Sequence, residues 1–157
     1  MVRIMKNYDN LKIKVETIFK DLHMEYEFLD FGDEDLNYDV NINTTGKLKT
    51  LGRINCILYF NDNDYSMNLI VANIYRIRND ENILYLYEIL NTINQMQRTG
   101  NFTIFNIKDT QQICYRCSVI CGKEFSELNK ALVEFHFQSF ISSLEILLKY
   151  LKEIKKD

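Results

Sequence analysis

The spacing of apolar positions divides this chain into segments with a helical period and segments with a strand period. The clearest example is residues 83–105, where a helix, a tight turn and a strand follow one another. One face of the predicted helix carries Ile83, Leu86, Tyr87, Leu90 and Ile93. We expect Asn79 or Asp80 to cap this helix. Residues 99–101 interrupt the helical period, and the alternation that begins at Phe102 is typical of a strand.

The first part of the chain predicts a helix followed by a strand. Residues 8–22 carry apolar side chains on one helical face, and Asn7 ahead of them is a suitable cap. Residues 26–31 are predicted as the first strand. The acidic residues 32–35 indicate a turn or a bulge, and residues 38–42 are interpreted as a continuation of that strand.

A hairpin is predicted next. Residues 43–52 are polar and contain two Gly, so we expect a surface loop. Every second residue is apolar over residues 54–60 and again over residues 65–71, in the sets Ile54, Cys56, Leu58, Phe60 and Tyr65, Met67, Leu69, Val71. Asn and Asp at positions 61–64 tolerate the left-handed backbone of tight turns, and they therefore join the two strands as a hairpin.

The last part of the chain predicts a second hairpin and a long helix. The strands of this hairpin are residues 101–107 and 112–121, with a turn at 108–111. A helical pattern then continues over residues 126–154, with Ser126 as a start signal. The predicted order is α-β-β-β-α-β-β-α. Antiparallel hairpins with helices between them indicate an α+β fold, an antiparallel sheet of about five strands with three helices.

Composition agrees with one globular, intracellular domain. The chain has 157 residues, 46% of them hydrophobic, and no Pro that would favour a linker, so we predict a single domain over residues 1–157. The net charge of -3 gives no steering towards nucleic acid or an anionic membrane. The sequence shows no signal peptide and no apolar run long enough for a bilayer, so we expect a cytoplasmic protein with reduced cysteines.

Three cysteines are close together at Cys114, Cys117 and Cys121, but their spacing does not predict a metal site. Zinc needs four converging ligands, whereas side chains 114 and 117 of one strand point to opposite faces. The two histidines, His23 and His136, stand in no ligand motif with them. We therefore expect plain cysteines, no metal and no cofactor.

Two other features that resemble functional motifs have a simpler explanation. Acidic and amide residues alternate at positions 33–39, as in a calcium loop, but Tyr38 stands where such a loop needs Gly and Thr44 where it needs Glu. We interpret them as turn residues. His136 lies among phenylalanines on the last helix with no nucleophile paired to it by any motif, so we expect a packed histidine and no catalytic residues.

Asn91 and Asn94 stand out within the first stretch, because Asn94 lies on the face that we expect to be buried. A buried amide must find hydrogen-bond partners. We predict that Asn94 clamps the backbone of the turn at residues 99–100 or of an adjacent strand. The alternative is an amide that binds a ligand.

The last helix carries more apolar residues than one sheet face needs. One stripe consists of Val133, Phe137, Phe140, Leu144, Leu147 and Leu151. Other apolar residues lie outside that stripe, and this suggests a second contact surface unless the domain itself covers both sides. The predicted partner-binding residues are Phe135, Phe137, Ile141, Ile146 and Tyr150.

Several short features together resemble a known family. They are Leu90-Asn91-x-x-Asn94, Gly100-x-Phe102, a hairpin ending in Tyr115-Arg116, and a long helix after Phe125-Ser126. This pattern resembles the YbjN-type family, whose members are described as candidate sensory transduction regulators, with a fold similar to type III secretion chaperones. The resemblance covers residues 7–154. It implies a chaperone-like α+β fold without catalytic residues, and a structural role for Asn91, Asn94, Gly100 and Phe102.

Relatives of the secretion-chaperone type form dimers and bind extended polypeptide segments. The resemblance therefore implies a non-enzymatic, cytoplasmic protein-binding module, a homodimer that buries partner segments on the last helix or at a sheet edge. The alternative is an immunity or antitoxin-type inhibitor that presents the acidic residues Asp33, Glu34 and Asp35. An enzyme or metal protein that uses the three cysteines is the third and weakest hypothesis.

Overall fold

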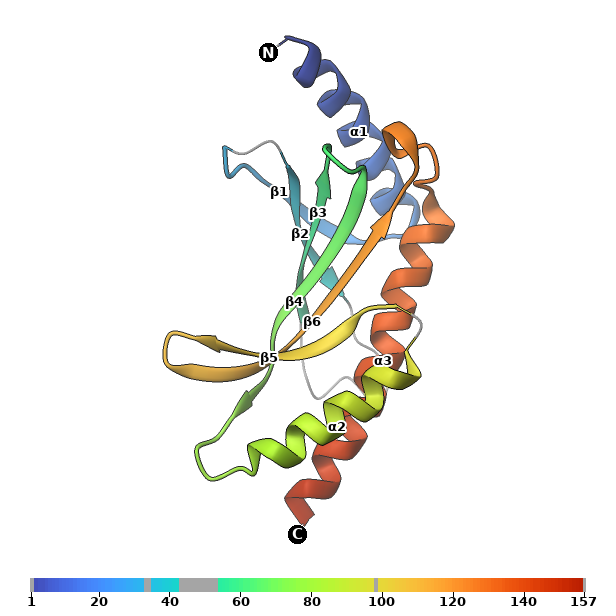
Figure 1. The fold of residues 1–157 in the computed structure, drawn as a ribbon. Helices are drawn as coiled ribbons and strands as arrows, with labels where there is room; N and C mark the ends of the chain where they lie inside the picture. The colour runs from blue at the N-terminus through green and yellow to red at the C-terminus, as the bar shows by residue number, and fades with distance from the viewer. Residues whose placement is uncertain (1, 33–34, 43–53, 98, 157) are drawn as a thin grey trace.

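The computed structural model describes residues 2–32, 35–42, 54–97 and 99–156, which form an antiparallel sheet and three α-helices (Figure 1). The α+β fold predicted from the sequence is confirmed. In chain order the elements are α1 (Val2–Asp21), β1 (Glu25–Leu29), β2 (Leu36–Ile42), β3 (Ile54–Asn61), β4 (Ser66–Ile77), α2 (Ile83–Met96), β5 (Asn101–Ile107), β6 (Thr110–Ile120) and α3 (Lys130–Lys156).

The six strands lie in the order β1-β2-β3-β4-β6-β5, and every neighbouring pair is antiparallel. The long helix α3 runs along one face of the sheet, with α1 beside its first half and α2 across its second half (Figure 1). The strand β5 lies at one edge of the sheet, next to α2. This arrangement places α2, α3 and the β5 edge together.

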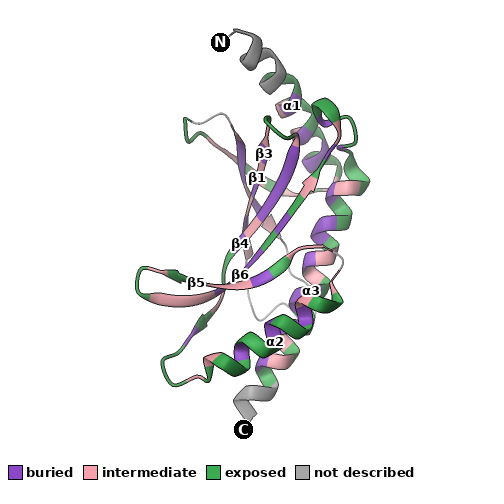
Figure 2. Cartoon of the chain, viewed as in Figure 1, coloured by how far each residue is buried: buried purple, intermediate pink, exposed green. Residues whose placement is uncertain are grey.

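The face of the sheet that meets the helices forms the hydrophobic core. Tyr38, Leu58, Leu69 and Cys117 lie opposite one another on four neighbouring strands, and all four are buried. Figure 2 shows buried positions concentrated along β4 and on the side of α3 that faces the sheet. The period of two that is visible in the sequence directs one set of side chains to the helices.

The opposite face of the sheet is not covered by α1, α2 or α3. Its side chains are mostly polar, and three of them share a chain of hydrogen bonds across two strands. Ser118 Oγ donates to Asn68 Oδ1 at 2.7 Å, and Asn68 Nδ2 donates to Ser66 Oγ at 2.9 Å. Antiparallel sheets commonly have one such polar face.

The sheet has one strand more than predicted because β1 and β2 form a hairpin. Residues 38–42 were expected to continue the first strand, but Glu25 pairs with Asn41 and Leu29 with Asn37, so the chain reverses between them. The Gly32 N–H donates to Asp30 Oδ1 at 3.0 Å, and Gly32 has a φ of +71°. This backbone region suits glycine, and it begins the turn that the sequence pattern left open.

The helices begin at other residues than predicted. The cap of α2 is Asn82, whose side chain accepts a hydrogen bond from the Tyr85 N–H, and not Asn79 or Asp80. The helix α3 begins after Asn129, whose Oδ1 accepts from the Leu132 N–H at 2.9 Å.

The predicted starts at Asn7 and Ser126 are also wrong. Asn7 lies inside α1, and Ser126 follows a 3-10 turn at Lys123–Phe125. Phe125 at the end of that turn is buried and packs edge-on against Phe60 and Tyr65. This aromatic contact holds the 3-10 turn against the sheet a few residues before α3 begins.

Both predicted later hairpins are present. Asn61 Oδ1 accepts from the Asn63 N–H and Asp64 Oδ1 from the Ser66 N–H in the β3–β4 turn. The β5–β6 turn is two residues shorter than predicted and consists of Lys108 and Asp109, with φ values of +47° and +65°. Positive φ at both positions is typical of the tight turns that match the twist of hairpin strands.

Over Lys130–Lys152, α3 is long and apolar enough to cross a membrane by length and composition, which differs from the sequence expectation. Its apolar stripe, however, packs on the sheet: Leu144 and Leu147 are fully buried there. A core helix meets the same criterion, so this is weak evidence for a membrane span.

Candidate protein-binding surface

The two sides of α3 have different surroundings. The predicted stripe from Val133 to Leu151 is buried throughout. The centroid of the Phe140 ring lies 4.7 Å from the centroid of the Tyr115 ring on β6. On the side turned away from the sheet, Phe135 is 51% exposed and Ile146 is 40% exposed. The helix therefore presents large apolar side chains to solvent as well as to the core.

The structure separates the predicted partner-binding residues. Phe137 is 6% exposed and belongs to the core, so it offers little surface to a partner. Ile141 and Tyr150 are partly buried. Among the five predicted residues, Phe135 and Ile146 remain as large exposed side chains.

Phe135 and Ile146 lie at the two ends of a groove between α2 and α3. We call it the α2–α3 groove; its volume is about 440 Å³, and it is lined by Ile93, Met96, Gln97, Thr99, Phe135, Gln138, Ser139, Ser142, Ser143 and Ile146. Ser139 and Ser142 are spaced on α3 so that they share one helical face with Phe135 and Ile146. Small side chains between two large apolar ones leave a depression, and the exposed Met96 borders it from α2.

Two polar atoms at the α2 end of this groove are buried without a hydrogen-bond partner. They are Nε2 and Oε1 of Gln97. A buried donor or acceptor without a partner costs about 1–3 kcal/mol. The sequence interpretation missed Gln97, because no sequence signal shows whether an amide near the end of a helix has hydrogen-bond partners.

Asn94 has both of the bonds that Gln97 lacks. Its Nδ2 donates to the Phe102 carbonyl at 2.9 Å, and its Oδ1 accepts from the Phe102 N–H at 2.8 Å. This is the backbone clamp that the sequence predicted, on the adjacent strand β5. Asn91 is exposed, and Tyr87, predicted on the buried face, is 48% exposed.

The clamp lies at the free edge of the sheet. Ile107 and Thr110 flank the two-residue turn and form a hydrogen-bonded pair, and the two kinds of pair alternate from there along the ladder. By this alternation Phe102 and Tyr115 form a non-hydrogen-bonded pair. The N–H and C=O of Phe102 therefore point away from β6 and towards Asn94.

Gly100 closes the same corner. Its φ is +73°, and a Cβ at this position would collide with the hydroxyl and ring of Tyr115. The Tyr115 hydroxyl donates to the Thr99 carbonyl at 3.3 Å. The turn between α2 and β5 therefore packs directly on a core tyrosine, which explains why this position holds glycine.

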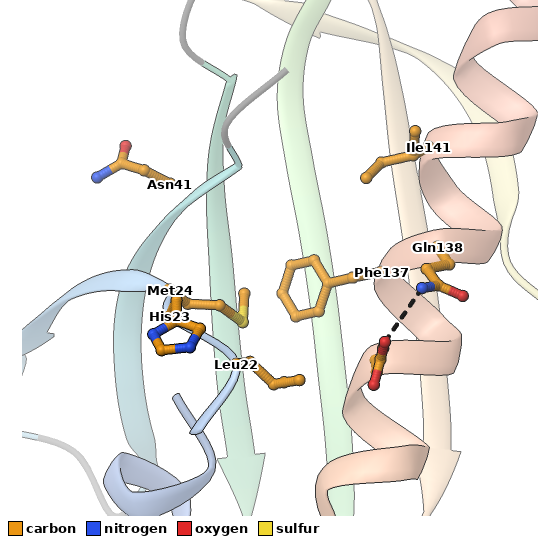
Figure 3. A pocket seen from close by; sticks show the side chains of 8 residues that line it. Leu22, His23, Met24, Asn41, Phe137, Gln138 and Ile141 are labelled. Carbon is orange, nitrogen blue, oxygen red and sulfur yellow. Dashed lines mark hydrogen bonds between the residues drawn. The ribbon is translucent and has the colours of Figure 1, made fainter. Parts of the chain in front are cut away.

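A second, smaller pocket lies on the other side of α3, between α3 and the α1–β1 connection (Figure 3). Its volume is about 240 Å³. The Phe137 ring points from α3 towards Met24 and Leu22, and Ile141 lies beside it. Ile141 and Ile146 thus line different cavities, so the predicted surface is not continuous.

One of the cysteines, Cys117, lies beside a histidine. Cys117 Sγ lies 3.4 Å from His136 Nδ1, and both residues are buried. Burial raises the pKa of the Cys117 thiol and lowers the pKa of His136, so both groups favour their neutral forms. A nucleophilic pair needs the opposite, a thiolate beside an imidazolium.

No metal site is found in the part of the chain that the structure describes. Cys114 lies on the opposite face of β6 from Cys117, and among the described residues no group of three His, Cys, Asp or Glu could hold an ion. Of the calcium-like segment, Asp33 and Thr44 lie outside the described residues. Asp64 Oδ1 accepts bonds from Ser66 and so acts as a turn residue.

The comparisons with known proteins identify the fold. No family model and no curated protein sequence matches the chain. Its structure is similar to the crystal structure of YbjN from E. coli, which is described provisionally as a transcription regulator. The TM-score is 0.59 at 13% sequence identity, over 88% of this chain and 90% of YbjN. The chain therefore has a YbjN-type fold, as the sequence motifs suggested.

Proposed function

We propose that this protein is a non-enzymatic, cytoplasmic regulatory protein that acts by binding another protein on the outer side of α3. The observation that carries the proposal is the pair of large apolar side chains, Phe135 and Ile146, exposed on a helix whose opposite side already fills the core. Exposed apolar side chains gathered at a groove are typical of protein interaction sites.

The fold supports a regulatory role, because the similar protein YbjN is described provisionally as a transcription regulator. The net charge of -3 does not favour direct DNA binding, which depends on many phosphate contacts by Lys and Arg. We therefore propose that regulation proceeds through a protein partner.

Site-specific photo-crosslinking in the source cells tests this proposal. A photoreactive phenylalanine analogue replaces Phe135 in one variant and Ile13 in a control variant. Ile13 is 67% exposed on α1, away from the groove residues. We expect a discrete cross-linked protein at position 135 and not at position 13. Equal labelling at the two positions, or none at position 135, would contradict the proposal.

The proposal includes a homodimer. Large apolar residues remain exposed outside the groove, among them Ile120 on β6 and Leu84 on α2, and they are available for contact between copies. Sedimentation equilibrium over a wide range of concentrations tests this point alone. A protein that stays monomeric throughout removes the dimer and leaves the partner-binding proposal in place.

A further inference from the structure

We propose that the α2–α3 groove binds an extended, uncharged peptide segment, and that the Gln97 carboxamide pairs with one peptide group of that segment. The inference rests on the proposed function and makes it specific, since it names the site and the chemistry of the partner. Three observations on the groove support it: unpaired polar atoms, a matching contact elsewhere in the chain, and an uncharged lining.

The first observation is the unpaired carboxamide. Both polar atoms of the Gln97 side chain are buried without a hydrogen-bond partner. Such groups raise the free energy of the unbound protein, because water no longer solvates them and no other group replaces the water. A ligand that offers a donor and an acceptor at this end of the groove removes that penalty once the side chain turns towards it.

The second observation is the Asn94 clamp. A carboxamide presents a donor and an acceptor side by side, and Asn94 uses both on the N–H and C=O of one residue, Phe102. Phe102 can accept this contact because it lies in an edge strand, where both groups point the same way. A helix pairs these groups internally. The ligand that fits Gln97 in the same manner is therefore an extended segment.

The third observation is the lining of the groove. None of the ten lining residues that the structure describes carries a charged side chain. Apolar walls come from Met96, Phe135 and Ile146, and the Ser143 hydroxyl is already paired, since it donates to the Ser139 carbonyl at 2.8 Å. A charged ligand side chain would lose its hydration here and gain no ion pair with the described lining residues, so the site favours an uncharged segment with an apolar side chain between Phe135 and Ile146.

Peptides selected from a random library displayed on phage serve as the probe, with the full chain as the target. The selected peptides are titrated into wild type and into Gln97→Leu, with Asn91→Leu as a matched control on the exposed side of α2. We expect Gln97→Leu to weaken binding about tenfold and Asn91→Leu to leave it unchanged. Thermal unfolding of Gln97→Leu verifies that this variant is folded.

A methyl group on one backbone nitrogen of the peptide identifies the paired peptide group. Methylation at the position that faces Gln97 should weaken binding to wild type about tenfold and have little further effect on Gln97→Leu. Equal losses in both proteins at every position would overturn the clamp. So would a selection without any peptide whose binding depends on Phe135.

The possible failures are distinguishable. If position 135 cross-links a partner in cells but Gln97→Leu binds every selected peptide as well as wild type does, the proposed function stands and this inference fails. If position 135 cross-links nothing, the proposed function fails as well. If Phe135→Ser and Gln97→Leu instead shift a monomer–dimer equilibrium, the occupant is a second copy of the chain, and the peptide proposal is overturned.

Discussion

The two sides of the helical layer formed by α2 and α3 both carry phenylalanine and carboxamide side chains, which differ in burial and in hydrogen bonding. On the inner side, Phe140 packs against Tyr115 and the Asn94 carboxamide has two hydrogen bonds. On the outer side, Phe135 is exposed and the Gln97 carboxamide has none. The inner side is therefore complete within one chain, whereas the outer side lacks contacts that a partner can supply.

The largest expected difference between the two sides is the loss of stability when a phenylalanine is replaced by alanine. Phe140→Ala removes a fully buried ring and should lower the free energy of unfolding by about 3–5 kcal/mol. Phe135→Ala should change it by no more than about 0.5 kcal/mol, because the ring is half exposed. Urea unfolding followed by circular dichroism measures both. Similar losses in the two variants would break the comparison.

The second effect concerns the corner where the turn meets the core. Gly100→Ala places a methyl group against Tyr115 in a left-handed backbone, and we expect a loss of more than about 2 kcal/mol. Gly32→Ala is the matched control, since Gly32 has a similar φ of +71° but no atom within 4 Å of the place that the added methyl group would take. The difference between the two variants, from the same unfolding experiment, reports the contact with Tyr115.

The third effect compares the two carboxamides. Asn94→Leu leaves the Phe102 N–H and C=O without their partner and should cost about 1–3 kcal/mol. Gln97→Leu removes two unpaired polar atoms, so the free energy of unfolding should stay the same or rise. Hydrogen exchange at the Phe102 amide should accelerate only in Asn94→Leu. A loss of stability in Gln97→Leu would show that its side chain is paired in the free protein.

The smallest expected effect is a pH dependence of the free energy of unfolding, caused by the buried His136. Burial lowers the pKa of His136 below its ordinary value of 6.5, which the unfolded chain keeps. As the pH falls below that value, the unfolded state takes up the proton first. The contribution of His136 to stability is therefore complete above about pH 6.5 and is lost on acidification.

Unfolding midpoints of wild type and His136→Gln at about pH 7.5 and about pH 5.5 measure this contribution. We expect wild type to lose more stability between the two values than His136→Gln does. An equal loss in the two proteins would mean that His136 titrates alike in the folded and unfolded states.

Much of the inner side could be predicted from the sequence. The buried stripe of α3 follows from its helical period, and the clamp follows from placing Asn94 on a buried face. Periodicity says which residues share a face, and for the inner side the sheet is the obvious neighbour. The β1–β2 hairpin was missed because its turn depends on the backbone conformation of Gly32, which a strand pattern does not reveal.

The outer side was only partly predictable. Excess apolar residues on α3 indicated a second surface, but Phe137 and Ile141 line the smaller pocket on the other side of the helix. The helical period does not determine how a helix is tilted against its sheet, so it could not predict this. Gln97 was overlooked since its meaning depends on what surrounds it: nothing in the sequence shows that it lacks a partner while Asn94 has two.

The Asn94 clamp also has a consequence for strand pairing at the free edge of the sheet. Along β5 the backbone groups of Phe102, Ile104 and Asn106 point outwards, and Asn94 occupies those of Phe102. An edge strand is a template for pairing with another chain through such outward groups. A strand that adds to β5 can therefore pair with Ile104 and Asn106, but at Phe102 it would have to displace the Asn94 carboxamide.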